Sequence, residues 1–226
     1  MMGVKMINQI IQGGRLSDKE IRKALLKQLY SNKNNLKIIE ELDVNAAIVD
    51  IATIDEDYFC GYEIKSDRDT LQRLPTQMQI YNYVFDKITI VICPSKLLDV
   101  INVIPNFWGI IVAKIENHNI YLVQMRPPEL NTNINIHWLS KKLWKSDIVN
   151  ILKIKNLYRG QSYRCRDSLL KILIDNTLLN ELKSHIRNVL INRFYDRCSI
   201  NHLENFKQEY IDMANKRLKK ISEVLF

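Results

Sequence analysis

The sequence predicts an α/β protein over residues 1–136 and a basic, mainly helical region over residues 137–226. Three observations support this division. In the first part, stretches rich in β-branched residues alternate with stretches of helical periodicity. The segment 126–135 then holds two prolines and four Asn or Thr residues, which is typical of a linker. The charge also changes: residues 1–140 hold 15 Lys/Arg against 16 Asp/Glu, whereas residues 141–226 hold 18 against 9.

A first helix and three strands are expected in the first part. The helix begins near Ser17-Asp18-Lys19-Glu20, which has the capping-box pattern and precedes apolar residues at helical spacing. A short strand with charged edges follows over 37–44, and an apolar strand over 46–54. The next strand, 61–66, is separated from the apolar one by Asp55-Glu56-Asp57. Because these three acids cannot be buried, the segment predicts a hairpin.

A second helix is expected after this hairpin, because apolar residues recur at helical spacing over 74–85. Asp69 and Gln72 form a second capping-box pattern, and Pro75 indicates that the helix begins or bends there. An apolar strand over 88–93 follows. The remaining expected elements are a helix over 96–104, a hairpin of strands 108–115 and 120–125, and helices over 138–153, 164–174, 178–193 and 202–224.

The first hairpin carries the strongest candidate for a functional site. Side chains alternate along a strand, so Glu63 and Lys65 share one face, and the hairpin can bring Asp50 opposite Glu63. Two carboxylates held together repel, and each buried charge costs several kcal/mol. A divalent cation would remove this conflict, and hard oxygen ligands suit Mg²⁺. The alternative is a buried ion pair of Glu63 with Lys65, with Asp50 as a strand-edge charge.

Asp50 followed by Glu63-Ile64-Lys65 resembles the motif of the PD-(D/E)xK nuclease superfamily. The resemblance covers roughly residues 17 to 155, and the string from 61 to 109 is similar to a small bacterial and phage family within the superfamily. It implies a restriction-endonuclease-like αβββαβ core with a mixed sheet. It also implies that Asp50, Glu63 and the backbone carbonyl of Ile64 hold Mg²⁺, for which Mn²⁺ can substitute. Lys65 would steady the attacking water.

The same resemblance suggests supporting residues. Gln77 and Tyr81 lie four residues apart, hence on one helix face, and resemble the Gln-x-x-x-Tyr element of RecB-like nucleases. The pair Gln79 and Tyr83 repeats the spacing, and a half-buried core tyrosine beside an exposed glutamine is a further alternative. Glu20 is a possible additional acid for the metal, although the capping box already explains it.

The basic excess points to a phosphate-binding surface. The candidate nucleic-acid-binding residues are Arg68, Arg73, Arg159, Arg164 and Arg166. The last three flank Tyr158 and Tyr163, and a basic loop interleaved with aromatic residues suits contacts with phosphates and bases. In the competing interpretation these three arginines pair with Asp167, Asp175 or Glu181 inside a helical bundle.

The sequence therefore predicts a hydrolase, a Mg²⁺-dependent (endo)deoxyribonuclease of phage biology, DNA repair or defence. Two alternatives stay open: a catalytically inactive nucleic-acid-binding protein of the same fold, and a structural ion-pair network in a protein-interaction module. The expected partner is DNA, and a homodimer would be needed to cut both strands in one encounter. No small-molecule cofactor is expected.

A cytoplasmic location is expected. The longest apolar runs, near 88–93 and 107–113, fall far short of a membrane span, and the first residues lack the apolar region of a signal peptide. The four cysteines are scattered without a C-x-x-C pair, so neither a zinc site nor a disulfide framework is expected.

Overall fold

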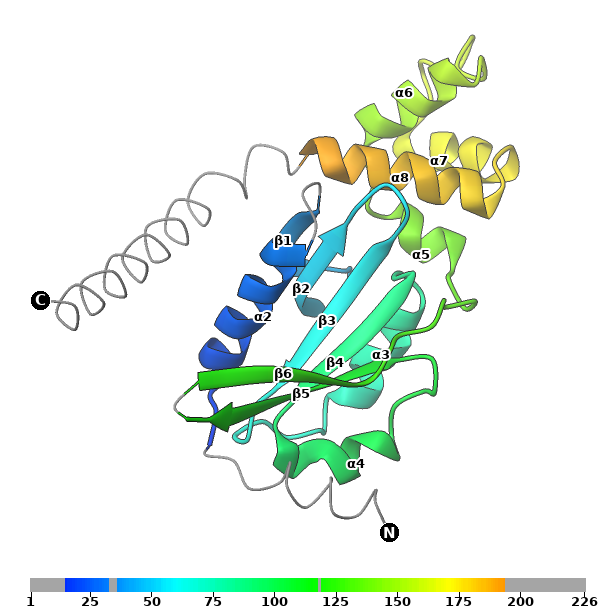
Figure 1. Cartoon of the computed structure of the whole chain (residues 1–226). Helices are drawn as coiled ribbons and strands as arrows, with labels where there is room; N and C mark the ends of the chain where they lie inside the picture. The colour runs from blue at the N-terminus through cyan, green and yellow to red at the C-terminus, as the bar shows by residue number, and fades with distance from the viewer. Residues whose placement is uncertain (1–14, 33–35, 118, 194–226) are drawn as a thin grey trace, which may run out of the picture.

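The computed structural model describes residues 15–32, 36–117 and 119–193 (Figure 1). A six-stranded sheet runs through it in the order β1-β2-β3-β4-β5-β6. Its strands are β1 Lys37–Asp43, β2 Ile48–Ile54, β3 Phe59–Lys65, β4 Lys87–Ile92, β5 Gly109–Glu116 and β6 Asn119–Arg126. The helices are α2 Asp18–Asn32, α3 Leu74–Asn82, α4 Leu97–Ile101, α5 Ile136–Ser140, α6 Lys145–Ile154, α7 Arg166–Asp175 and α8 Leu179–Arg193. The predicted helix 202–224 lies outside the described residues.

The sheet is mixed. Strand β2 is antiparallel to both β1 and β3. Strands β3, β4 and β5 run parallel to one another, and β6 returns antiparallel to β5. Parallel neighbours need a crossover connection, which α3 supplies between β3 and β4, and α4 between β4 and β5. The α/β class and the order helix, three strands, helix, strand are therefore confirmed.

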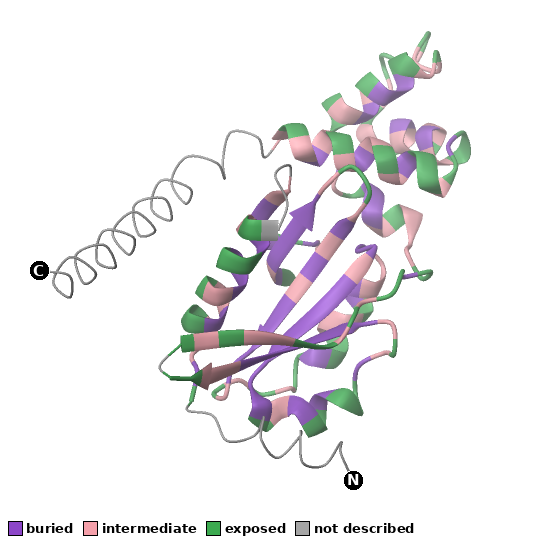
Figure 2. Ribbon diagram, in the orientation of Figure 1, coloured by how far each residue is buried: buried purple, intermediate pink, exposed green. Residues whose placement is uncertain are grey.

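Apolar side chains cover both faces of the sheet, and the central strands are almost wholly buried (Figure 2). One apolar cluster joins Ile21 and Leu25 of α2 to Ile64 of β3. The other joins strand residues to α3 and to the C-terminal helices, including Leu74 and Leu182. Because residues alternate along β3, Ile64 faces α2 while its neighbours in sequence face α3.

The start of α3 differs in part from the prediction. The capping box of Asp69 with Gln72 is wrong, because the Asp69 carboxylate accepts hydrogen bonds from the Ser66 amide at 2.7 Å and hydroxyl at 2.6 Å. These bonds close the turn after β3. Helix α3 begins instead at Leu74, with Pro75 in the first turn as predicted, where its missing N–H has no cost.

Two predicted helices are shorter in the structure. The helix expected over 74–85 ends at Asn82, where the Asn131 side chain donates to the carbonyls of Asn82 and Phe85. The helix expected over 96–104 is a 3₁₀ turn, Pro94–Lys96, followed by the short α4.

The single helix expected over 138–153 is two helices, α5 and α6. Between them, Lys142 Nζ donates to the carbonyl of Asp43 at 2.6 Å, which ties this junction to the turn between β1 and β2. The amide of Trp144 then donates to the Asp147 carboxylate at 2.6 Å and opens α6. The break therefore comes from a contact with a residue far away in the sequence.

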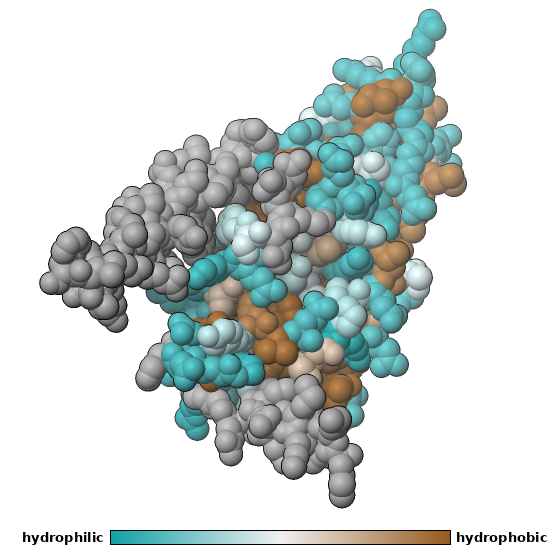
Figure 3. Space-filling model, in the orientation of Figure 1, coloured by the Kyte–Doolittle hydropathy of each residue, from teal (hydrophilic) through white to brown (hydrophobic). Residues whose placement is uncertain are grey.

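Helices α6, α7 and α8 gather at one end of the sheet (Figure 1), where Arg187 of α8 donates to the carbonyl of Glu56 in the turn between β2 and β3. Their surface is largely hydrophilic, with scattered apolar patches (Figure 3). The large exposed apolar side chains of this region are Trp144, Ile154, Tyr163 and Leu178. Within the described ranges, no helix is long and apolar enough to cross a membrane.

Candidate active site

The site lies where β2 and β3 separate. Their backbone pairing ends at Ile51 with Tyr62, and beyond it the amide of Ile64 donates to Asp50 Oδ2 at 2.7 Å. A side-chain carboxylate thus accepts the bond that a backbone carbonyl would accept in a continued ladder. A cavity of about 890 Å³ opens here. The acids that line it are Asp18, Glu41, Asp43, Asp50, Glu63 and Asp69, and the basic residues are Lys65 and Arg73.

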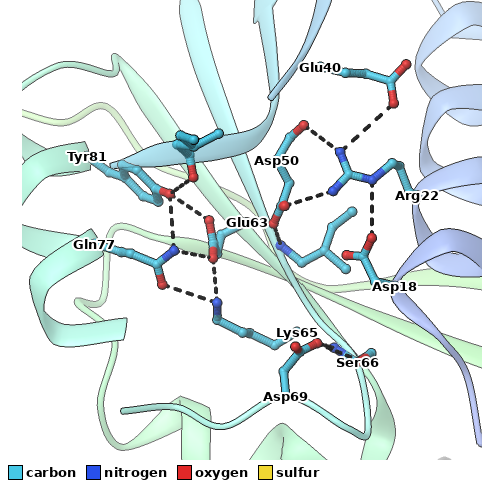
Figure 4. Close-up of polar contacts among 12 residues, drawn as sticks. Asp18, Arg22, Glu40, Asp50, Glu63, Lys65, Ser66, Asp69, Gln77 and Tyr81 are labelled. Carbon is cyan, nitrogen blue, oxygen red and sulfur yellow. Dashed lines mark hydrogen bonds and ion pairs between the residues drawn. The ribbon is translucent and has the colours of Figure 1, made fainter. Parts of the chain in front are cut away.

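Glu63 is the centre of a closed hydrogen-bond network (Figure 4). Its side chain is 2% exposed. Oε1 accepts from Lys65 Nζ at 2.5 Å and from Gln77 Nε2 at 2.7 Å, and Oε2 accepts from the Tyr81 hydroxyl at 2.7 Å. Glu63 and Lys65 share one face as predicted, and α3 meets Glu63 through Gln77 and Tyr81.

Tyr81 serves this network as a neutral donor. Burial, followed by the negative charge of Glu63, raises the pKa of Tyr81 far above its ordinary range. Its oxygen also lies 2.8 Å from the carbonyl oxygen of Ile48, and Gln77 Oε1 accepts from Lys65 Nζ at 3.1 Å. The side chains of Glu63 and Lys65 are therefore held from several directions.

Asp50 is less buried than Glu63, and its side chain is 23% exposed. Burial, and next the negative charge of Glu63, raise the pKa of Asp50 to about 6. Hydrogen bonding from the Ile64 amide and the charge of Arg22 act in the opposite direction. The mutual repulsion that the sequence predicted is thus present between Asp50 and Glu63.

Arg22 is a site residue that the sequence analysis missed. Its Nη2 lies 2.8 Å from Asp50 Oδ1, and its Nη1 donates to the Asp50 main-chain carbonyl at 2.9 Å. Only its position four residues after Asp18 is a recognisable sequence signal, and that spacing predicts a pair on the helix surface. The contact with Asp50 joins residues 28 apart and follows from the packing of α2 on the sheet.

Glu20 caps the start of the first helix. Its carboxylate accepts from the Ser17 amide at 2.9 Å and hydroxyl at 2.6 Å, so the capping interpretation is confirmed, and Glu20 is not among the residues that line the cavity. These bonds lower the pKa of Glu20. The acid of α2 that lines the cavity is Asp18.

The donor set suits a hydrated Mg²⁺ ion rather than a metal enclosed by protein. Among the residues that the structure describes, no group of three or more His, Cys, Asp or Glu side chains is arranged to hold a metal. Asp50, Glu63 and Ile64 nevertheless line one cavity and offer two carboxylates and a backbone carbonyl. Mg²⁺ prefers hard oxygen ligands and keeps several of its waters, so this set fits it.

The five candidate arginines differ in their places. Arg73 lines the cavity, whereas Arg68 and the other three are not among its lining residues. Arg159 is exposed. Arg164 bonds to Gln161 and lies 5.6 Å from the ring of Tyr163.

Arg166 is held by the helical bundle. It donates to the carbonyl of Leu143 from Nε and Nη2, at 3.3 and 2.9 Å, and pairs with Asp167 at 3.0 Å. The competing interpretation of the basic loop thus applies to Arg166. Glu181, another acid of that interpretation, pairs with Lys155 at 2.6 Å rather than with an arginine of the loop.

Fold and site together define a mixed α/β protein with an acidic cleft and a buried lysine in its wall. The chain belongs to the bacteriophage P4 protein cII family, whose model matches residues 12–221. It is 24% identical to Protein cII of Enterobacteria phage P4 over 185 residues, which cover 80% of this chain and 69% of that protein. The predicted association with phage is supported.

One solved structure is similar at a lower level. It is the SPO1766 protein of unknown function from Silicibacter pomeroyi, at 14% sequence identity and a TM-score of 0.39. The similarity covers 64% of this chain and 94% of that one.

Proposed function

We propose that this protein is a Mg²⁺-dependent nuclease that hydrolyses phosphodiester bonds in DNA, on a core of the PD-(D/E)xK type. The order α2, β1, β2, β3, α3, β4 supports the proposal, because it follows the αβββαβ pattern that the motif implies. The positions of Asp50 and Glu63 at the separating ends of one hairpin support it further.

The observation that carries the proposal is the place of Lys65. Its ammonium is 2.5 Å from Glu63 Oε1, both side chains are buried, and both line a large cavity beside Asp50. An ion pair that served stability alone would be best enclosed and neutral, since unbalanced buried charge is costly. Here six acids and only two basic residues line the cavity, which suits a site that receives a cation.

Each residue has a defined task in the proposal. Asp50, Glu63 and the carbonyl of Ile64 would hold Mg²⁺, which when bound activates water and neutralises charge on the scissile phosphate. Lys65 would donate to the oxygen on which negative charge develops. Arg73, at the cavity wall, would contact a neighbouring phosphate.

Gln77 and Tyr81 would fix the orientation of Glu63. Both donate to its carboxylate, one to each oxygen, so the side chain cannot turn without breaking a hydrogen bond. A metal ligand held in this way needs little rearrangement when the ion arrives.

The decisive test is an incubation of the purified protein with supercoiled plasmid, linear duplex, single-stranded DNA and RNA. Each substrate is tested with Mg²⁺, with Mn²⁺ and with EDTA. We expect DNA cleavage with either ion and none with EDTA. Cleavage that persists in EDTA would contradict the proposal, and DNA binding without cleavage would support the catalytically inactive alternative.

Calorimetry tests the metal site independently of activity. Asp50→Asn and Glu63→Gln each remove one of the two carboxylates and should abolish Mg²⁺ and Mn²⁺ binding. Circular dichroism of both variants controls for folding. Unchanged metal affinity in both folded variants would exclude a metal site here.

A further inference from the structure

The Arg22 side chain contacts both the carboxylate and the main-chain carbonyl of Asp50 (Figure 4). One guanidinium nitrogen lies 2.8 Å from Asp50 Oδ1, and another lies 2.9 Å from the Asp50 carbonyl oxygen. The Arg22 side chain is 15% exposed, so its charge is little screened by water. Glu63 pairs with Lys65, and Asp50 thus pairs with Arg22 of α2.

The second oxygen of Asp50 has an anchor of its own. Oδ2 accepts from the amide of Ile64 at 2.7 Å, and this bond belongs to the hairpin rather than to α2. The orientation of the carboxylate is therefore kept even when its contact with Arg22 is broken. Charge compensation and orientation of Asp50 are supplied by two different groups.

Arg22 also has acids outside the pair with Asp50. Its Nε lies 3.3 Å from Asp18 Oδ2, one helical turn earlier, and its Nη1 lies 3.9 Å from Glu40 Oε2. A guanidinium that left Asp50 would therefore not remain as an uncompensated buried charge. This arrangement makes the contact with Asp50 replaceable at low cost.

From this geometry we infer that Arg22 is a resident counter-cation of Asp50, which a divalent ion must displace. The inference rests on the proposed metal site. Without the metal, Arg22 offsets the repulsion between Asp50 and Glu63 and fastens α2 to β2. When a divalent ion binds, the positive charge of Arg22 repels it and weakens its binding. Arg22 is thus a positioning residue that sets how tightly the site binds its ion.

The test compares metal affinity in the wild type, Arg22→Gln and Arg22→Lys by calorimetry with Mg²⁺ and Mn²⁺. Glutamine can keep one hydrogen bond to Asp50 without the charge, so affinity should rise about tenfold or more, the size of effect that one neighbouring charge has on a site. Lysine keeps the charge, and its affinity should stay within about threefold of the wild type. Arg187→Gln, which removes a charge at another buried acid, should leave the affinity unchanged.

Thermal unfolding gives a second readout. Metal-free Arg22→Gln should melt at a lower temperature than the wild type, because the two carboxylates then repel without compensation. Saturating Mg²⁺ should raise its melting temperature by more than it raises that of the wild type, since a tighter ligand stabilises more.

A measurement on the wild type covers the case in which Arg22→Gln does not fold. In a ¹⁵N spectrum, the Nε signal of Arg22, assigned with Arg22→Lys, should shift as Mg²⁺ is added. An Nε signal that stays fixed while the Ile64 amide shifts would overturn the inference.

The outcomes separate this inference from the proposed function. If the wild type and Arg22→Gln bind the ion equally well, the inference is wrong and the metal site stands. If neither binds, both are wrong. Binding by Arg22→Gln alone supports the counter-cation role and shows that Arg22 blocks the site in the free protein.

Discussion

Glu63 and Asp86 are both buried carboxylates, 2% and 3% exposed, but their charges are compensated differently. Asp86 has two cations from α8: it forms an ion pair with Lys183 and lies 3.8 Å from Arg187, and it accepts from the Phe59 amide at 2.8 Å. The cavity beside it measures about 10 Å³, room for one water at most. This acid is enclosed with an excess of positive charge.

Glu63 shows the opposite arrangement. It has one cation, Lys65, and a second acid, Asp50, close enough to raise the pKa of that residue. Both acids face a cavity of about 890 Å³ whose other charged residues are mostly acidic. Burial of a carboxylate alone therefore does not mark a functional site. The sign of the surrounding charge and the access to solvent distinguish the two places.

The largest expected effect on stability lies at the enclosed acid. Asp86→Asn keeps an acceptor for the Phe59 amide but leaves Lys183 and Arg187 without their partner, and breaking a buried pair in this way costs about 3–5 kcal/mol. Urea denaturation measures the loss. Metal affinity and cleavage of the folded variant should stay at the wild-type level, and a loss below about 1 kcal/mol would contradict the role of Asp86 as a tie to α8.

The two lysines that pair with buried acids, Lys65 and Lys183, offer a matched pair for activity. Lys65→Ala should lower DNA cleavage by about two orders of magnitude or more while metal affinity is kept, as is typical when a donor to developing charge is removed. Lys183→Ala removes a lysine from the other buried acid and should reduce stability without lowering cleavage at temperatures where it is folded. Native-rate cleavage by Lys65→Ala would return Lys65 to a purely structural ion pair.

The metal-free protein should reveal the repulsion at the open site through its pH dependence. The pKa of Asp50 is raised to about 6 in the folded state from an ordinary value of 3.8, so between these values the folded chain binds the proton more tightly. The contribution of Asp50 to stability is therefore present below pH 4 and is lost as the pH rises through 6, by on the order of 1–3 kcal/mol.

Asp50→Asn removes this dependence. In EDTA, its melting temperature should match that of the wild type near pH 4 and exceed it above pH 6.5. Saturating Mg²⁺ should then stabilise the wild type and leave the variant unchanged. If the melting temperatures of the two proteins differ by the same amount at all pH values, ionisation of Asp50 does not destabilise the folded protein.

The hairpin was predictable because its signals are local. Alternation along a strand places Glu63 and Lys65 on one face, and the acidic turn sets how the two strands pair, so both features followed from adjacent residues. The apolar stripe of the next helix is also a local signal: Tyr81 lies on it, which favours the pair of Gln77 and Tyr81, and both residues contact Glu63 in the structure.

The missed features depend on contacts between distant segments. Arg22 reaches Asp50 only because α2 packs across β2, and no local pattern distinguishes it from the other basic residues of that helix. The break between α5 and α6 depends on Lys142 and the carbonyl of Asp43, 99 residues apart. Glu20 is a different case, since a capping role and a metal-binding role both fitted this residue in the sequence, and only the fold shows its carboxylate at the helix cap.

The basic half of the molecule gives the smallest and most graded prediction. Residues 141–193 hold twelve Lys/Arg against four Asp/Glu, so the described helices are strongly basic. In the loop before α7, Arg159 is exposed and Arg164 lies beside an exposed tyrosine, whereas Arg166, the first residue of α7, bonds to the carbonyl of Leu143 and to Asp167. Neutralising all three together would therefore mix binding with stability.

Separate variants resolve the two roles. Arg159→Gln with Arg164→Gln should weaken DNA binding equally for all sequences and reduce the slope of log affinity against log salt by roughly 0.9 for each lost phosphate contact. Cleavage at saturating DNA should be kept, because neither residue lines the cavity. Arg166→Gln should instead lower the melting temperature and leave the salt slope unchanged, since its donors already bond to Asp167 and to the carbonyl of Leu143, which lies between α5 and α6. Melting temperature and salt slope measured on the same preparations compare the two variants directly. If the double variant keeps the wild-type slope, the basic helices do not supply the DNA affinity, and Arg73 at the cavity becomes the next residue to test.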